Sequence, residues 1–292
     1  MSRSYAAWWF VAPALLVLAV FFFIPVLAAF AMSLTDFDLY ALGDLSNLRV
    51  IGLRNYGQLL VDPLFWKALG NTFYFVLLGV PLSIGASLGA ALLVNSKLAR
   101  FRNFFRTVYF APVVTTLVAV AVVWRYIFHT RYGFLNYVLS WVGIDPIDWM
   151  GEPRWAMPAI VILAVWKNFG YNMIILLAAL QSIPDDLYEA ARIDGASGWQ
   201  LFRHVTLPGL APVLTLVSIL TIAGYFQLFA EPYVMTEGGP LQSTMSVLYF
   251  MYEEGFKWWS LGRASAVAFL LFVIMFAITL LQLSVSRRRE RA

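Results

Sequence analysis

The chain contains no cysteine among its 292 residues. It therefore has no disulfide, no thiolate nucleophile and no cysteine-ligated metal site. It also lacks the sequence G-x-x-x-x-G-K-[ST], so no phosphate loop is visible that would let this chain hydrolyse ATP. With only two histidines, it offers no metal-ligand cluster and no nucleophile–base pair. The sequence predicts no catalytic residue, no metal site and no cofactor in this chain.

Charge is also scarce. Lys, Arg, Asp and Glu make up 12% of the residues, while hydrophobic residues make up 61%. Soluble domains carry about 25% charged residues, so this composition predicts a protein embedded in a lipid bilayer. The net charge of +4 is small and is explained by the distribution of basic residues across a membrane, so we expect no nucleic-acid partner.

Six apolar segments are long enough to cross the hydrocarbon core, which takes roughly 20 helical residues. We expect transmembrane helices at about 8–32, 68–94, 107–128, 156–181, 207–230 and 264–286. The first could instead be a cleaved signal peptide, but its apolar run exceeds the roughly 7–15 residues of a signal core. The expected fold class is an all-α membrane protein with six transmembrane helices in a single domain, residues 1–292.

The positions of Lys and Arg predict the orientation. On the side that holds both termini and the connection at about 182–206, basic residues outnumber acidic ones, and on the opposite side the reverse is true. The positive-inside rule places both termini in the cytoplasm. His129 and His204 then fall on opposite sides of the membrane and cannot pair within one subunit.

The connection after the fourth span is polar and predicts two short helices. Asp185 and Asp186 suit the positive end of a first helix. Gly195 can take the positive φ that ends it. Ser197 followed by Gln200 has the form of a capping box that starts a second helix. We expect a compact pair of helices held between two membrane spans.

The same connection carries a family resemblance. Glu189-Ala190-Ala191, then Gly195, then Val205-Thr206-Leu207-Pro208 resemble the EAA loop of bacterial ABC import permeases, with Val205 where the family has isoleucine. Asp194, Ala196 and Phe202 resemble the form found in permeases that import oligosaccharides and glycerol phosphates. Two further segments are similar to that group, namely 104–112 (FFRTVYFAP) and 236–240 (TEGGP).

The resemblance implies a type I ABC importer permease fold in the bacterial plasma (inner) membrane. It implies three kinds of partner: a second homologous permease subunit, a cytoplasmic ATPase dimer that binds ATP and Mg, and an extracytoplasmic solute-binding protein. The loop would be the coupling element that docks on the ATPase. The expected ATPase-coupling residues are Glu189, Ala190, Ala191, Asp194, Gly195, Ala196, Phe202, Leu207 and Pro208.

Polar and aromatic side chains in the fourth and fifth spans are candidates for a solute pathway, since such groups should face protein or a cavity. They are Trp166, Lys167, Asn168, Tyr171, Thr221, Tyr225 and Gln227. Maltose-type permeases, which the chain resembles, take contacts from these two spans. Leu228 replaces a polar residue of that pattern, which argues against maltose itself. Alternatively, the Asn and Thr side chains bond across helices and the Tyr rings pack.

Lys167 is the most unusual of these residues. A cation inside a span costs roughly 2.5–3.5 kcal/mol on insertion scales, so it needs a partner or a watery pocket. Two partners would meet this need: an anionic or polyhydroxylated ligand, or a carboxylate of a partner subunit. The solute itself remains open between a sugar-like molecule and an amino acid, polyamine or anion. A secondary transporter is disfavoured because no carboxylate lies well inside a span, Glu231 standing only at the end of the fifth.

Overall fold

The computed structural model describes residues 3–96 and 101–291. Over these ranges the backbone is helical and forms no strand, apart from an isolated antiparallel bridge between Thr35 and Val50. The chain divides into two compact units. The first comprises Met1–Trp66 and Phe250–Ile274, and the second comprises Lys67–Tyr249 and Met275–Ala292. That the whole chain acts as one permease domain stays a prediction.

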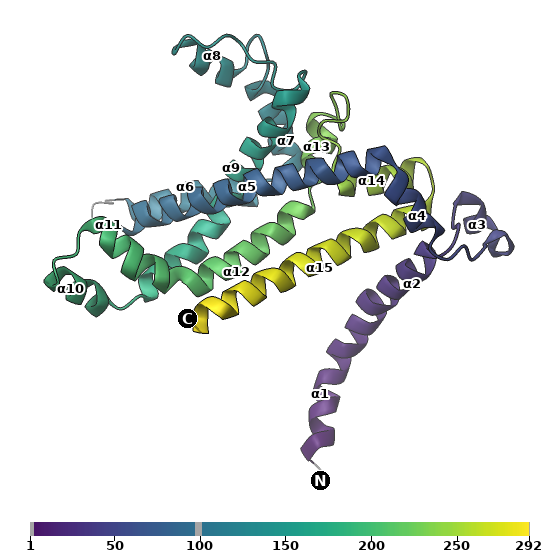
Figure 1. Ribbon diagram of the computed structural model, residues 1–292, viewed down its shortest axis with the longest axis horizontal. Helices are drawn as coiled ribbons and strands as arrows, with labels where there is room; N and C mark the ends of the chain where they lie inside the picture. Colours follow the sequence, from purple (N-terminus) through teal and green to yellow (C-terminus); the bar gives the residue numbers. More distant parts are fainter. Residues whose placement is uncertain (1–2, 97–100, 292) are drawn as a thin grey trace. The chain divides into compact units, whose positions relative to one another are not determined.

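Most of the described chain belongs to long helices joined by short ones (Figure 1). In chain order they are α1 (Arg3–Leu18), η1 (Ala19–Phe23), α2 (Ile24–Ser33), α3 (Leu39–Gly43), η2 (Leu45–Asn47), α4 (Arg54–Val61), α5 (Pro63–Asn95), α6 (Arg102–Val114), α7 (Leu117–Ile127) and α8 (Phe134–Ser140). They continue with α9 (Pro153–Ser182), α10 (Asp185–Ile193), α11 (Gly198–Leu201), η3 (Phe202–Thr206), α12 (Leu207–Phe226), α13 (Ala230–Met235), α14 (Val247–Tyr252), η4 (Glu253–Lys257) and α15 (Leu261–Arg291).

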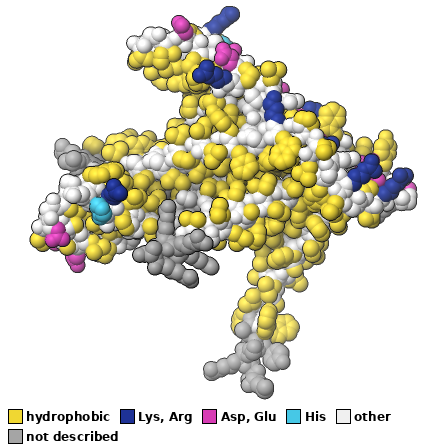
Figure 2. Space-filling view, in the orientation of Figure 1, with side chains coloured by type: hydrophobic (Ala, Val, Ile, Leu, Met, Phe, Trp, Pro, Cys, Tyr) yellow, Lys and Arg dark blue, Asp and Glu magenta, His cyan; other side chains and the backbone are white. Residues whose placement is uncertain are grey.

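Five helical segments of the described chain are long and apolar enough to cross a membrane, and each contains most of one predicted span. They are Trp8–Ser33, Pro63–Asn95, Pro153–Ser182, Gly198–Met235 and Leu261–Val285. Hydrophobic side chains cover most of the face that Figure 2 displays, and charged ones are sparse on it. Along the first segment large hydrophobic side chains are exposed, Phe10 by 87%, which suits contact with lipid.

The third predicted span, 107–128, is two helices rather than one. α6 ends at Val114, α7 begins at Leu117, and the two axes differ by 101°. Thr115 and Thr116 between them are extended, with ψ of 149° and 135°. Pro112 lacks the N–H that would continue the helical hydrogen bonds, and the following β-branched residues favour extended backbone. The total of six spans holds when this pair is counted as one broken span.

The predicted orientation of the termini rests on charge and stays a prediction. Lys97 and Arg100, two of the basic residues counted for the cytoplasmic side, lie outside the described residues. So do the side chains of Arg3 and of the basic residues from Arg287 to Arg291.

In the second unit, a hydrophobic core joins α5, α9 and α12. Its buried members are Ala90, Ala91, Val94, Met173, Leu176, Leu177, Leu180, Leu210 and Val217. α6 packs against α9 as well. At that crossing Gly170 lies so close to α6 that an added Cβ would come 2.0 Å from the carbonyl oxygen of Tyr109. The absence of a side chain at Gly170 therefore lets two membrane helices touch backbone to backbone.

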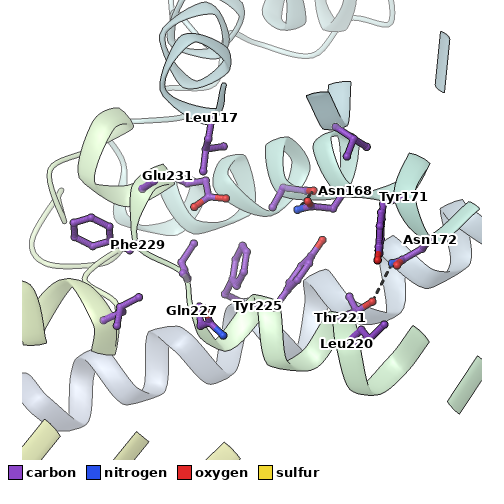
Figure 3. Close-up of a pocket in the computed structure, with 17 residues that line it drawn as sticks. Leu117, Asn168, Tyr171, Asn172, Leu220, Thr221, Tyr225, Gln227, Phe229 and Glu231 are labelled. Atoms are coloured by element: carbon purple, nitrogen blue, oxygen red, sulfur yellow. Dashed lines mark hydrogen bonds between the residues drawn. The ribbon is translucent and has the colours of Figure 1, made fainter. Parts of the chain in front are cut away.

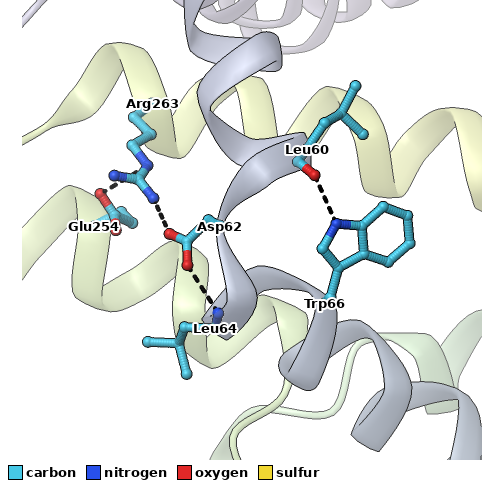
Figure 4. A network of polar contacts seen from close by, with 6 residues as sticks. All are labelled: Leu60, Asp62, Leu64, Trp66, Glu254 and Arg263. Carbon is cyan, nitrogen blue, oxygen red and sulfur yellow. Dashed lines mark hydrogen bonds and ion pairs between the residues drawn. The ribbon is translucent and has the colours of Figure 1, made fainter.

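In the first unit, an ionic network fixes the start of α5 to the start of α15 (Figure 4). One carboxylate oxygen of Asp62 accepts the Leu64 amide at 2.8 Å, and the other pairs with Arg263. The Arg263 guanidinium also lies 3.5 Å from a Glu254 oxygen and 5.8 Å from the Phe250 ring centre. Burial raises the pKa of Glu254, and Arg263 opposes that effect.

We predict that Gly170→Ala destabilises the protein by about 1–3 kcal/mol or more, because the methyl group has no space beside the Tyr109 carbonyl. The matched control is Gly85→Ala on α5, where an added Cβ meets nothing within 4 Å. That variant should be neutral or more stable by up to about 1 kcal/mol. Thermal unfolding of both purified variants in detergent, followed by tryptophan fluorescence, makes the comparison. Equal melting temperatures for the two would contradict the close crossing.

Candidate functional site

A cavity of about 530 Å³ opens within the second unit, between α9 and α12 (Figure 3). This volume falls in the range of small-molecule sites, about 300–1,000 Å³. Its walls combine apolar side chains with a few polar ones. The polar and charged lining residues are Asn168, Tyr171 and Asn172 on α9, Thr221 and Tyr225 on α12, then Gln227 and Glu231.

Five of the seven predicted pathway residues come together here: Asn168, Tyr171, Thr221, Tyr225 and Gln227. Their surroundings differ. Thr221 accepts a hydrogen bond from the Asn172 amide at 2.9 Å, which ties the two spans together. The Asn168 amide nitrogen donates to the Ala164 carbonyl at 2.9 Å, whereas Tyr171 is 48% exposed. Some of these polar side chains, such as Asn172 and Thr221, therefore bond between helices, while others, such as Tyr171, are exposed in the cavity lining.

Tyr225 is held by α5. Its ring stacks on Phe75 with centres 4.9 Å apart. It also covers Gly79, where an added Cβ would lie 2.5 Å from the ring. The Tyr225 hydroxyl is buried beside the Ser83 and Asn168 side chains, yet among the described residues it makes no hydrogen bond of regular geometry. A buried hydroxyl left without a partner in the wall of a cavity is a group that a bound solute could satisfy.

Lys167 does not line this cavity. Its ammonium group donates to the carbonyl oxygens of Pro112 at 3.0 Å and Thr115 at 2.8 Å, at the end of α6. The last carbonyls of a helix have no partner within the helix, and they form the negative end of its dipole. The partner of Lys167 is therefore the broken end of the third span, which differs from both partners considered from the sequence.

Trp166 lies outside the cavity too. Its ring packs edge-on against Trp124 of α7, with ring centres 5.5 Å apart. It contributes to another surface of the helix pair, together with Pro81 and Phe169. The packing alternative describes this residue better than a pathway role does.

Glu231 lines the cavity and was not among the expected pathway residues. α12 ends at Phe226, and after a short connection α13 begins at Ala230 and packs against α7. This turn carries the Glu231 carboxylate back to the cavity (Figure 3). Its position at the end of an apolar run suggested a boundary residue. The available signal was Gln227 followed by Pro232, which marks a helix that stops and restarts.

The connection at 182–206 forms the two expected short helices, α10 and α11. Gly195 has a φ of +82° and ends α10 in a Schellman motif. Its amide bonds the Arg192 carbonyl at 3.0 Å, and the Ala196 amide bonds the Ala191 carbonyl at 2.9 Å. Ser197 and Gln200 form a complete capping box at the start of α11. Both local predictions are confirmed.

The two halves of this connection are also joined by side chains. The hydroxyls of Tyr188 in α10 and Thr206 in η3 are 3.0 Å apart, and within the second half the Trp199 and Phe202 rings pack 5.4 Å apart. Glu189 is exposed and forms no ion pair among the described residues. Its neighbours on the expected coupling face vary in exposure. Ala190, Asp194, Gly195, Leu207 and Pro208 are exposed, whereas Ala191, Ala196 and Phe202 are half-buried.

Comparison with known proteins establishes the family. Residues 79–291 match the model of the binding-protein-dependent transport system inner membrane component. Two relatives extend the match over almost the whole chain. A lactose transport system permease protein of Rhizobium radiobacter is 36% identical over 97% of this chain and 94% of its own. A trehalose/maltose transport system permease protein of Thermococcus litoralis is 36% identical over 95% and 92%.

An arabinooligosaccharides transport system permease protein of Bacillus subtilis is 33% identical over 98% of this chain and 90% of its own. Among solved structures, a bacterial ABC transporter involved in the import of alginate superposes with a TM-score of 0.82. That chain is 23% identical and the match covers 98% of this chain and 96% of that one, so it shows the shared fold.

The chain therefore belongs to the family of inner membrane components of binding-protein-dependent transport systems. It is a multi-pass permease subunit of an ABC importer with an all-helical fold. The resemblance seen in the sequence is confirmed.

We predict that Lys167→Met destabilises the protein, because it removes the ammonium donor from the Thr115 carbonyl and leaves the Pro112 carbonyl with only the Thr115 hydroxyl and amide. Each unsatisfied buried group costs about 1–3 kcal/mol. Lys67→Met is the matched control. The Lys67 ammonium also bonds a carbonyl, that of Leu241 at 2.6 Å, but at an exposed position. Thermal unfolding in detergent should show a clear loss for Lys167→Met and little change for the control. The capping role would be contradicted by equal stability of Lys167→Met and the parent protein.

Proposed function

We propose that this chain forms half of the translocation pathway of an ATP-driven importer for a sugar, an oligosaccharide or a glycerol-phosphate-like solute. The observation that carries the proposal is the cavity between α9 and α12, where hydroxyl and amide groups meet aromatic rings within membrane-spanning helices. The names of the relatives, which refer to lactose, arabinooligosaccharides and trehalose/maltose, support a saccharide.

The lining suits a polyhydroxylated molecule. Amides and hydroxyls exchange hydrogen bonds with sugar hydroxyls, and aromatic faces pack on the C–H faces of sugar rings. Tyr171 presents an exposed ring, and Tyr225 presents a hydroxyl that makes no regular hydrogen bond within the described part of the chain. In the hydrocarbon region such groups are costly unless they face a cavity or another polar group. A solute in transit supplies the missing hydrogen bonds.

The connection at 182–206 is proposed to transmit the work of ATP hydrolysis. A separate cytoplasmic ATPase dimer binds ATP and Mg and docks on α10 and α11. Three large apolar side chains support this: Leu187, Ile193 and Trp199 are 53%, 86% and 67% exposed. They share the connection with the unpaired Glu189, which can meet a basic group of the ATPase. The Schellman motif, the capping box and the Tyr188–Thr206 contact make the connection stiff enough to pass on a push.

The other partners follow from the same proposal. A second homologous permease completes the cavity, and an extracytoplasmic solute-binding protein delivers the solute. Both termini and the coupling connection lie in the cytoplasm, in the bacterial plasma (inner) membrane, because the basic residues collect on that side.

We predict that Gly195→Val abolishes coupling while the permease still inserts in the membrane. A β-branched residue cannot adopt a φ of +82° without strain, so the orientation of α11 relative to α10 changes. Gly198→Val is the matched control, since Gly198 starts α11 with no positive φ and no atom within 4 Å of an added Cβ. Co-purification of the ATPase and solute-stimulated ATP hydrolysis in liposomes are measured for both. Normal coupling in Gly195→Val would remove the connection from its proposed role.

A second prediction concerns the cavity. Tyr225→Phe removes only the unpartnered hydroxyl, so stability should be unchanged or slightly higher. If that hydroxyl binds solute, the apparent KM for uptake should rise by about fivefold to tenfold, the value of one hydrogen bond. Tyr126→Phe, at an exposed position off the cavity, should leave KM unchanged. Unaltered uptake by Tyr225→Phe would assign the ring to packing alone.

A further inference from the structure

The cavity between α9 and α12 has one charged residue in its described lining, Glu231. The cation nearest in sequence to the lining, Lys167, is engaged by the carbonyls at the end of α6 and is absent from the lining. Lys167 is close enough for its charge to act on Glu231, but of the two residues Glu231 lines the space that a solute would fill. The described lining therefore presents a carboxylate and no cation, while Lys167 lies behind the lining.

Two features hold Glu231 in this place. α13 is fixed at its start by the Tyr233 amide, which donates to the Phe229 carbonyl at 3.0 Å, and by the stacked rings of the same two residues. α13 also packs against α7. Within the described chain the Glu231 carboxylate forms no ion pair and no hydrogen bond to another side chain. Its oxygens point toward Asn168 and Tyr225 across the cavity (Figure 3).

We infer that Glu231 is a specificity-determining residue that admits uncharged polyhydroxylated solutes and excludes anionic ones, such as sugar phosphates and uronic acids. This inference rests on the proposed function and narrows it. A carboxylate accepts hydrogen bonds from two neighbouring hydroxyls of a sugar, in the charge-assisted form that is stronger than a neutral bond. A phosphate or carboxylate in the same position meets a like charge in a poorly screened space whose described lining contains no cation. The glycerol-phosphate-like solute is thereby removed from the proposed range.

The absence of cysteine allows a direct measurement of the cavity's charge. Ala230→Cys places a single thiol in the lining, beside Glu231. The assembled transporter in liposomes is treated with cationic and anionic methanethiosulfonate reagents, and each rate is divided by the rate with free 2-mercaptoethanol. The cationic reagent should react faster by about tenfold or more, as expected for a unit charge a few ångströms away.

Substitutions at Glu231 then test whether this residue causes the faster reaction with the cationic reagent. Glu231→Gln in the Ala230→Cys background should remove most of the rate difference, and Glu231→Asp should keep it. Glu237→Gln makes the same change six residues along the chain and outside the lining, so it should have no effect. Equal rates for the two reagents in the parent, or the same preference after Glu231→Gln, would overturn the inference.

Uptake supplies the second readout. Lactose and maltotriose are the uncharged probes, and their uronic-acid counterparts are the anionic probes. The inference predicts uptake of an uncharged probe, inhibition by it at concentrations about tenfold below those of its uronate, and loss of this discrimination in Glu231→Gln. Equal handling of both probes by the parent would contradict the inference. If the transporter takes up neither the uncharged nor the anionic probes, the proposed saccharide function is rejected. The thiol reaction rates alone would then determine the charge of the cavity.

Discussion

The ammonium group of Lys167 donates hydrogen bonds to the backbone carbonyls at the end of α6, a membrane helix that stops partway across its span. In a bilayer no water is present to satisfy the last carbonyls of α6, so a broken span persists only if another group donates to them. Lys167 does so at 2.8 and 3.0 Å, from a neighbouring helix that crosses α6 at Gly170. One costly cation and one exposed set of carbonyls thus satisfy each other. The contact lies at the 101° bend between α6 and α7.

The same contact keeps the ammonium group out of the cavity lining. Lys167 bonds the end of α6, while the polar residues that follow it on α9, Asn168 and Tyr171, line the cavity. α7 then packs against α13, which carries Glu231 to the opposite wall. The break between α6 and α7 and the restart of the chain as α13 after α12 both contribute to this arrangement. The Glu231 carboxylate thereby lies among the amides, hydroxyls and aromatic rings of the cavity. The neutral selectivity that we infer follows from that placement.

Periodicity and composition predicted what depends on local sequence. The long apolar runs, the glycine that ends α10 and the Ser197–Gln200 capping box all appear where they were expected, since each is determined within a few residues. The gathering of Asn168, Tyr171, Thr221 and Tyr225 also followed, because two neighbouring spans carry them. The partner of Lys167 could not be found in this way, because it consists of backbone carbonyls about 50 residues earlier, which any sequence provides.

Glu231 shows the same limit. In sequence it stands at the end of an apolar run, and only the restart of the chain as α13 turns it back to the cavity. Its presence weakens the sequence argument that a secondary transporter lacks a suitable carboxylate. The family match, over residues 79–291, excludes that class instead. Local patterns predicted the long helices and the two short helices of the connection at 182–206, while long-range packing determined which polar groups face one another.

The most direct test of this account is a high-resolution cryo-electron microscopy map of the assembled transporter in lipid nanodiscs, examined at Lys167. We predict that its Nζ atom lies within hydrogen-bonding distance of the Pro112 and Thr115 carbonyls, that α6 and α7 are separated by extended backbone, and that the Glu231 carboxylate faces the cavity. A continuous helix through Thr115 and Thr116, with the Lys167 ammonium in the cavity beside the solute, would contradict it.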